Sequence, residues 1–106
     1  LKWIRALKGE ETHLIDVEHV LFFHAEDKYT TVATAEGEYL IRKPIKELEQ
    51  ELDNNQFWRI HRSTIVKAAA VESSRRDISG GYQLKIKDSK RKLKVIRNYA
   101  YLFKQM

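Results

Sequence analysis

Residues 57–66 hold the side chains of this chain that are best suited to binding chemistry. The segment reads FWRIHRSTIV and places two arginines, a histidine and two hydroxyl residues among apolar ones. The apolar side chains can anchor the segment in a core, which leaves a cluster of hydrogen-bond donors: Arg59, His61, Arg62, Ser63 and Thr64. Donors on a rigid anchor are suited to gripping phosphates and reading base edges. The segment therefore indicates contact with a nucleic acid.

The charge of the chain is divided along its length. Residues 1–58 carry 7 Lys and Arg against 12 Asp and Glu, a net charge of −5. Residues 59–97 carry 12 Lys and Arg against 3 Asp and Glu, a net charge of +9. Such segregation predicts a basic face that meets a polyanion and an acidic face turned away from it. A well-solvated surface is the plainer explanation, but the aromatic and hydroxyl residues within the basic part favour a function.

Length and composition limit the class of protein. A chain of 106 residues fits one domain with a substantial core. The absence of cysteine excludes disulfides and thiolate metal sites and favours a reducing compartment, so we expect a cytoplasmic protein. No apolar run approaches membrane-spanning length. Because the chain begins at Leu1 without an initiator methionine, we expect a C-terminal fragment of a longer protein.

Most of the chain alternates apolar and polar residues over short segments, which is typical of strands. Strands are expected at residues 2–8, 12–16, 20–25, 29–35, 38–42, 82–87 and 92–97, with extended chain at 68–73. Arg75 and Arg76 are expected in a loop between strands. The pattern of many short strands predicts a mainly β fold.

Two helical segments are expected. One is a short amphipathic helix over residues 44–53, opened by Pro44, with Ile45, Leu48 and Leu52 on one face. Its remaining face is rich in glutamate, so we expect it to lie away from any nucleic acid. The other is a C-terminal helical turn over residues 99–105.

The chain has poor candidates for catalysis or metal binding. His13, His19 and His24 lie on different expected elements, without the spacing of a metal site. Ser63 lies near His61, but no nucleophile elbow, oxyanion loop or placed carboxylate accompanies the pair. We therefore expect neither an enzyme nor a bound metal or cofactor.

The lysines of the last two strands have two interpretations. Lys87, Lys90 and Lys92 individually are expected to serve solubility and edge protection. Their summed field still attracts DNA. Lys94 is expected to contact phosphate or to orient a loop, and Arg75 and Arg76 are candidates for contact with the DNA backbone.

The order of these parts resembles the LytTR DNA-binding domain, the output module of many bacterial response regulators. The segment from Phe57 to Val66 follows the family's F-x-R-x-H-R-S-x-[IV]-V-N signature, and Lys67 stands in place of the final Asn. A later Ser-Arg pair of the family corresponds to Ile96 and Arg97. The resemblance covers the whole chain, as one domain over residues 1–106. It implies an elongated arrangement of antiparallel β-sheets whose loops enter successive major grooves of double-stranded DNA.

The resemblance also implies which residues meet DNA and how. By position, Lys28, Arg62 and Arg97 are expected to lie close to the bases, and Arg97 can bond guanine O6 and N7 together. His61 and Ser63 are expected to bond phosphates or to orient their loop. Such domains usually occupy repeated half-sites as a dimer, while an isolated domain can be monomeric. Arg59 is instead expected to be structural, paired with an acidic residue of the preceding helix.

Two other functions are compatible with the sequence. One is a small β module for a nucleotide second messenger, because Asp77 and Ser79 begin the D-x-S-x-x-G motif of PilZ-type domains. Tyr82 stands where the glycine of that motif belongs. The other is a protein-interaction module with an incidental basic face.

Overall fold

The computed structural model describes residues 1–106 and is built mainly from strands. Ten strands are present: β1 (Trp3–Lys8), β2 (Glu11–Asp16), β3 (Val20–Ala25), β4 (Thr30–Thr34), β5 (Gly37–Ile41), β6 (Phe57–His61), β7 (Thr64–Lys67), β8 (Val71–Arg76), β9 (Tyr82–Ile86) and β10 (Lys92–Val95). The helices are α1 (Ile45–Glu51) and three 3-10 helices, η1 (Val17–His19), η2 (Ala68–Ala70) and η3 (Arg97–Phe103). The predicted mainly β fold with one short α-helix is confirmed.

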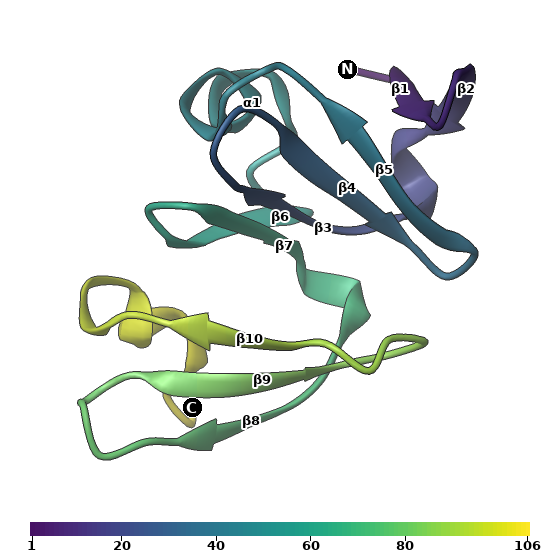
Figure 1. The fold of residues 1–106 in the computed structure, drawn as a ribbon. Helices are drawn as coiled ribbons and strands as arrows, with labels where there is room; N and C mark the ends of the chain where they lie inside the picture. Colours follow the sequence, from purple (N-terminus) through teal and green to yellow (C-terminus); the bar gives the residue numbers. More distant parts are fainter.

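The strands form two antiparallel sheets. One has seven strands in the order β2-β1-β5-β4-β3-β7-β6, and the other has three in the order β10-β9-β8. Figure 1 shows the seven-stranded sheet and α1 in the upper part of the molecule and the three-stranded sheet below them. The molecule measures 42 × 25 × 25 Å, so the expected elongated shape is also confirmed.

Alternation along the central strands produces two hydrophobic cores. On β3, Phe23 belongs to the core that contains the α1 residues, whereas Phe22 belongs to the core shared with the three-stranded sheet. On β7, Ile65 and Val66 divide in the same way. Successive strand residues point to opposite faces. The middle of the seven-stranded sheet is therefore covered by α1 on one face and by the second sheet on the other.

Helix α1 is shorter than the expected helix over residues 44–53. Pro44 is the N-cap, with an extended backbone at ψ 157°, so the helix begins one residue later. It ends before Leu52, whose backbone is again extended while its amide donates to the Leu48 carbonyl. The extended backbone at Leu52 ends the helix and leaves the buried Leu52 in the same core as Leu48. The predicted apolar face is correct, and only the boundaries were wrong.

The expectation of extended chain over residues 68–73 was partly wrong, and the loop predicted for Arg75 and Arg76 was wrong. The chain makes the 3-10 turn η2 before β8 begins at Val71. In β8, Arg75 pairs with Gln83 and Arg76 with Tyr82. Pairing with β9 thus continues to the last residue before Asp77.

The C-terminal segment also differs in detail from the expected strand and helical turn. Strand β10 ends at Val95, and the 3-10 helix η3 already begins at Arg97. The Phe103 ring of η3 contacts Trp58 edge-on, with ring centroids 5.7 Å apart. The aromatic side chain of Trp58 is therefore a core anchor rather than an exposed stacking platform.

Candidate nucleic-acid interface

The turn between β6 and β7 presents Arg62 and is braced from behind by Arg59. Arg59 Nε donates to the His61 carbonyl at 2.8 Å, and its Nη2 donates to the Arg62 carbonyl at 2.6 Å. Its Nη1 donates to Glu49 Oε1 of α1 at 2.7 Å. The guanidinium therefore connects the helix to both carbonyls of the turn. This confirms the sequence-based expectation that Arg59 pairs with an acidic residue of the helix.

His61 and Ser63 form the inner side of the same turn. The Ser63 amide donates to His61 Nδ1 at 3.2 Å, and Ser63 Oγ lies 3.0 Å from the same nitrogen. Because Nδ1 accepts from a backbone N–H, the neutral ring carries its proton on Nε2. Burial and then the charge of Arg62 lower the pKa of His61 below its ordinary value. Nε2–H is thus the only N–H donor that the neutral ring offers.

The turn that carries Lys28 lies beside the Arg62 turn. The Ala25 amide donates to the Ser63 carbonyl at 2.7 Å, which places the end of β3 against the start of β7. The Glu26 amide then donates to the Tyr29 carbonyl at 2.8 Å and closes the turn around the exposed Lys28. Neither Lys28 nor Arg62 has an ion-pair partner. Two free cations therefore project from adjacent turns.

Arg97 lies at the start of η3, where hydrogen bonds connect the chain to β6 and to the loop between β8 and β9. The Ile96 amide donates to the Ile60 carbonyl of β6 at 3.0 Å. Arg97 Nη2 donates to the Ser79 carbonyl at 3.0 Å in the loop between β8 and β9. A Cβ at Gly80, where φ is +92°, would lie 2.8 Å from Arg97 Nε. The left-handed backbone conformation favours glycine at this position, whereas the flexible guanidinium alone could shift away from a Cβ.

The β8–β9 loop is closed by Asp77. Its Oδ1 accepts from the Ser79 amide at 2.9 Å and from Ser79 Oγ at 2.6 Å, and its Oδ2 accepts from Lys94 Nζ at 3.0 Å. These hydrogen bonds, led by those from the Ser79 side chain and Lys94, hold the pKa of Asp77 well below its usual range. Asp77 and Ser79 thus serve to close their own loop. Lys94 enters this network as a structural partner as well as a surface cation.

The structure gathers the Lys28 turn, the Arg62 turn, the β8–β9 loop and Arg97 along one side of the molecule. The three loops and the start of η3 lie along the left of the view in Figure 1. A hollow on the three-stranded sheet is lined by Arg75, Arg76 and Lys94, together with Asp77 and Gln83. All eight residues predicted to meet DNA therefore lie on this side or on the adjoining sheet.

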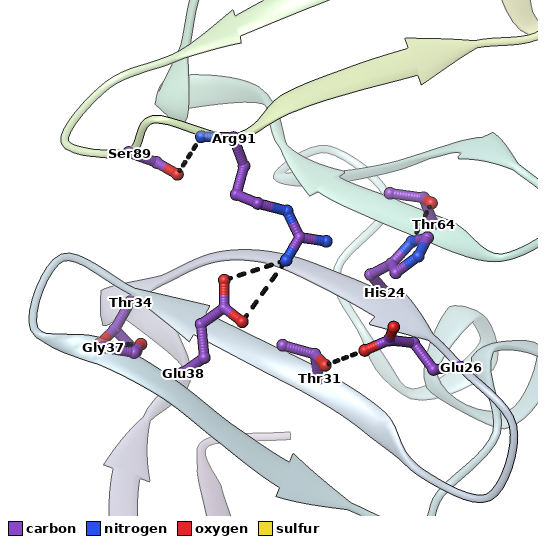
Figure 2. Close-up of polar contacts among 9 residues, drawn as sticks. All are labelled: His24, Glu26, Thr31, Thr34, Gly37, Glu38, Thr64, Ser89 and Arg91. Carbon is purple, nitrogen blue, oxygen red and sulfur yellow. Dashed lines mark hydrogen bonds and ion pairs between the residues drawn. The ribbon is translucent and has the colours of Figure 1, made fainter.

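Three further residues, which the sequence did not single out as DNA contacts, share a groove with predicted ones. His24, Arg91 and Lys92 line a groove together with the predicted His61, Ser63 and Lys94. Figure 2 shows His24 facing Thr64, with His24 Nδ1 2.9 Å from Thr64 Oγ1. His24 lies 40 residues from Thr64 in the chain, so only the β3–β7 pairing reveals the contact.

Arg91 reaches across the gap between the two sheets. Figure 2 shows it extending from the loop between β9 and β10 to the carboxylate of Glu38 on β5, at 3.3 Å. Its guanidinium also lies 5.5 Å from the centre of the Phe22 ring. The position of Arg91 in a lysine-rich turn was the sequence feature that could have drawn attention to it. The sequence did not indicate with which carboxylate it forms an ion pair.

Lys67, which departs from the LytTR signature, and Ile96, which departs from the later Ser-Arg pair, have defined local consequences. Lys67 donates from Nζ to the main-chain carbonyl of Glu18 and so connects the end of β7 to η1. Ile96 is the N-cap of η3 and gives no side-chain hydrogen bond there. A hydroxyl at that position could cap the helix, because serine is a favoured N-cap residue.

Comparisons with known proteins identify the family of this chain. The family model of the LytTr DNA-binding domain matches residues 10–106. An uncharacterized response regulatory protein of Vibrio cholerae is 42% identical over 96% of this chain and 40% of its own length. The positive alginate biosynthesis regulatory protein of Pseudomonas aeruginosa is 42% identical over 78% of this chain and 32% of its own length. The chain thus spans well under half of each relative.

A solved structure extends the agreement to the fold. A LytTr DNA-binding domain from Bacillus cereus, whose parent protein is described as a putative methyl-accepting/DNA response regulator, superposes with a TM-score of 0.88. It is 22% identical and covers 96% of this chain and 93% of that domain.

None of the helices in the present structure has both the length and the apolar character needed to cross a membrane. The chain belongs to the LytTr DNA-binding domain family.

Proposed function

We propose that residues 1–106 form one sequence-specific, double-stranded DNA-binding domain of a bacterial transcription regulator that acts in the cytoplasm. The observation that carries the proposal is the junction of three turns by main-chain hydrogen bonds. Ala25 joins the Lys28 turn to Ser63, and Ile96 joins Arg97 to β6. The main-chain segments that carry three cations from distant parts of the sequence are thereby joined on one side of the molecule. Rigid positioning of this kind is needed to read base edges in a defined order.

In this proposal the three turns read successive major grooves. Lys28, Arg62 and Arg97 lie nearest the bases, and Arg97 is suited to a guanine because its fork can bond O6 and N7 together. His61, Ser63, Arg75, Arg76 and Lys94 meet phosphates or hold the turns in place. Lys94 must share its ammonium between Asp77 and a phosphate, so its contribution is smaller than that of an unpaired lysine.

The longer regulator binds two repeated half-sites as a dimer, whereas the isolated domain is a monomer. The domain itself measures 42 Å in its longest dimension, which exceeds one helical turn of DNA of about 34–36 Å. One copy therefore has the reach to contact adjacent major grooves of one half-site. The second half-site requires a second copy.

Selection from random double-stranded DNA, followed by sequencing, tests the proposal. The wild type should enrich a repeated motif. Arg97→Ala should weaken binding to that motif by about 1–3 kcal/mol and blur the preference at one base pair. Arg75→Ala is the matched control, because the exposed Arg75 has no ion-pair partner and loss of a phosphate contact weakens all sequences alike. An unenriched pool with the wild type, together with tight binding to a cyclic dinucleotide or an acidic protein, would contradict the proposal.

A further inference from the structure

The outer face of the three-stranded sheet is a second cationic surface. Strand β9 alternates buried Tyr82, Leu84 and Ile86 with exposed Gln83 and Lys85. The pairing register places two rows of side chains across this exposed face, Arg75–Gln83–Lys94 and Ser73–Lys85–Lys92. The face therefore carries four cations and two neutral hydrogen-bonding residues.

Few carboxylates neutralise this face. Lys85 pairs with Glu72 at 3.2 Å, and Lys94 pairs with Asp77 at 3.0 Å. Arg75 and Lys92 have no ion-pair partner. Lys92 and Lys85 are direct partners across the strands, an arrangement that destabilises a sheet through repulsion. A polyanion bound to the face would relieve that repulsion.

The outer face is continuous with the proposed DNA interface. Lys92 and Lys94 line the groove that contains His61 and Ser63. Lys92 also lines a hollow on the outer face with Ser73, Arg75, Gln83 and Lys85. Strand β10 is the edge of its sheet, so the basic surface passes around this edge without interruption. A DNA strand leaving the groove would meet the outer face next.

We propose that Lys85 and Lys92 bind phosphates of the same duplex, in the DNA that flanks the base pairs read by the turns. The inference rests on the proposed function and extends the phosphate contacts beyond Arg75 and Lys94. The face offers lysines, which bind phosphate as point charges. It therefore adds affinity and salt dependence without base preference. This role goes beyond the solubility and edge protection expected for Lys92 from the sequence.

The test compares two duplexes that contain the same selected half-site. One ends at the half-site, and the other adds about ten base pairs, one helical turn, on each side. The variant is Lys85→Gln with Lys92→Gln. The control is Arg5→Gln with Lys46→Gln, which removes two exposed cations from β1 and α1 instead. Thermal unfolding of both variants confirms that the fold is intact.

On the flanked duplex, two lost phosphate contacts should reduce the slope of log K against log salt by about 1.8. The double-lysine variant should lose less binding on the short duplex than on the flanked duplex, because Lys92 also lines the groove beside His61, and it should keep the same base preference. The control should retain the advantage of the flanks. Equal salt slopes of the wild type on both duplexes would overturn the inference, as would an equal loss of binding by the variant on both. Failure of the wild type to select any motif would instead overturn the proposed function.

Discussion

Arg59 illustrates how one side chain can act on DNA without touching it. Its three hydrogen bonds reach Glu49 and the carbonyls of His61 and Arg62, and its side chain is only 16% exposed. The direction in which Arg62 points therefore depends on a guanidinium located behind it. We regard Arg59 as a positioning residue of the Arg62 turn.

Arg59→Lys should separate positioning from charge. Lysine keeps the charge but lacks the planar fork that spans the three acceptors. We expect the free energy of unfolding to fall by about 1–3 kcal/mol and the base preference near Arg62 to blur. The salt dependence of binding should stay unchanged because no charge is lost. Urea unfolding and DNA selection measure the two effects.

Arg5→Lys is the matched control for this prediction, since Arg5 is an exposed arginine on β1. It should change neither stability nor base preference. If Arg59→Lys lowered stability but left the selected motif sharp, Arg59 would be a residue of the fold alone.

His61 should make stability depend on pH. Its pKa is lowered in the folded state by burial and by the charges of Arg62, His24, Lys94 and Arg59. The unfolded chain, with an ordinary pKa of about 6.5, then binds the proton more readily. The free energy of unfolding should therefore fall as the pH decreases through 6.5 towards the folded-state pKa.

His61→Asn tests this dependence, because the amide oxygen can still accept from the Ser63 amide but does not titrate. Urea unfolding at pH 7.5 and pH 5.5 should show a smaller loss of stability for the variant than for the wild type. The other three histidines are present in both proteins, so the comparison isolates His61. An equal loss in both proteins would exclude His61 as the source.

At the scale of elements, the second core holds the two sheets together. Leu84 of β9 is fully buried in this core with Phe22 and Val66 of the larger sheet. Leu84→Ala should lower the free energy of unfolding by about 2–5 kcal/mol, because the cavity lies between two sheets. Leu14→Ala is the control, since Leu14 is 63% exposed and its loss should cost little. Similar unfolding midpoints in urea would contradict a shared core.

The elements were more predictable than their limits and contacts. Alternation identified β9, and the helical spacing of Ile45, Leu48 and Leu52 identified the apolar face of α1, because both patterns are local properties of the sequence. The place of Arg75 and Arg76 in β8 was missed, since it depends on pairing with β9 and on the β8–β9 loop that Asp77 closes. The contact of His24 with Thr64 depends on strand order and could not be read from either segment alone.

The candidate site shows the same division. The signature around Arg62 drew attention to the turn that Arg59 holds in place, and the charge split predicted a basic side. Neither the signature nor the charge split could show that Arg97 donates to the Ser79 carbonyl or that Lys94 pairs with Asp77. Those contacts depend on the loop conformation at Gly80 and Asp77, which tertiary packing determines.

At the scale of the whole molecule, the charge distribution should dominate the response to salt. If about six phosphates are neutralised, the logarithm of affinity should fall with the logarithm of salt at a slope near −5. Fluorescence anisotropy with the selected duplex at several salt concentrations measures this slope. A flat response over ordinary buffer concentrations would argue against phosphate-driven binding.

The contact between Arg97 and Ser79 has a consequence for the entropy of binding. Arg97 is already held against Gly80 and the Ser79 carbonyl, whereas Lys28 has no ion-pair partner. Immobilising a long side chain on binding costs about 0.5–1.5 kcal/mol. For Arg97 this loss of freedom accompanies folding, while for Lys28 it accompanies complex formation. Contacts at the Arg97 end of the site should therefore form with less entropic opposition than those at the Lys28 end.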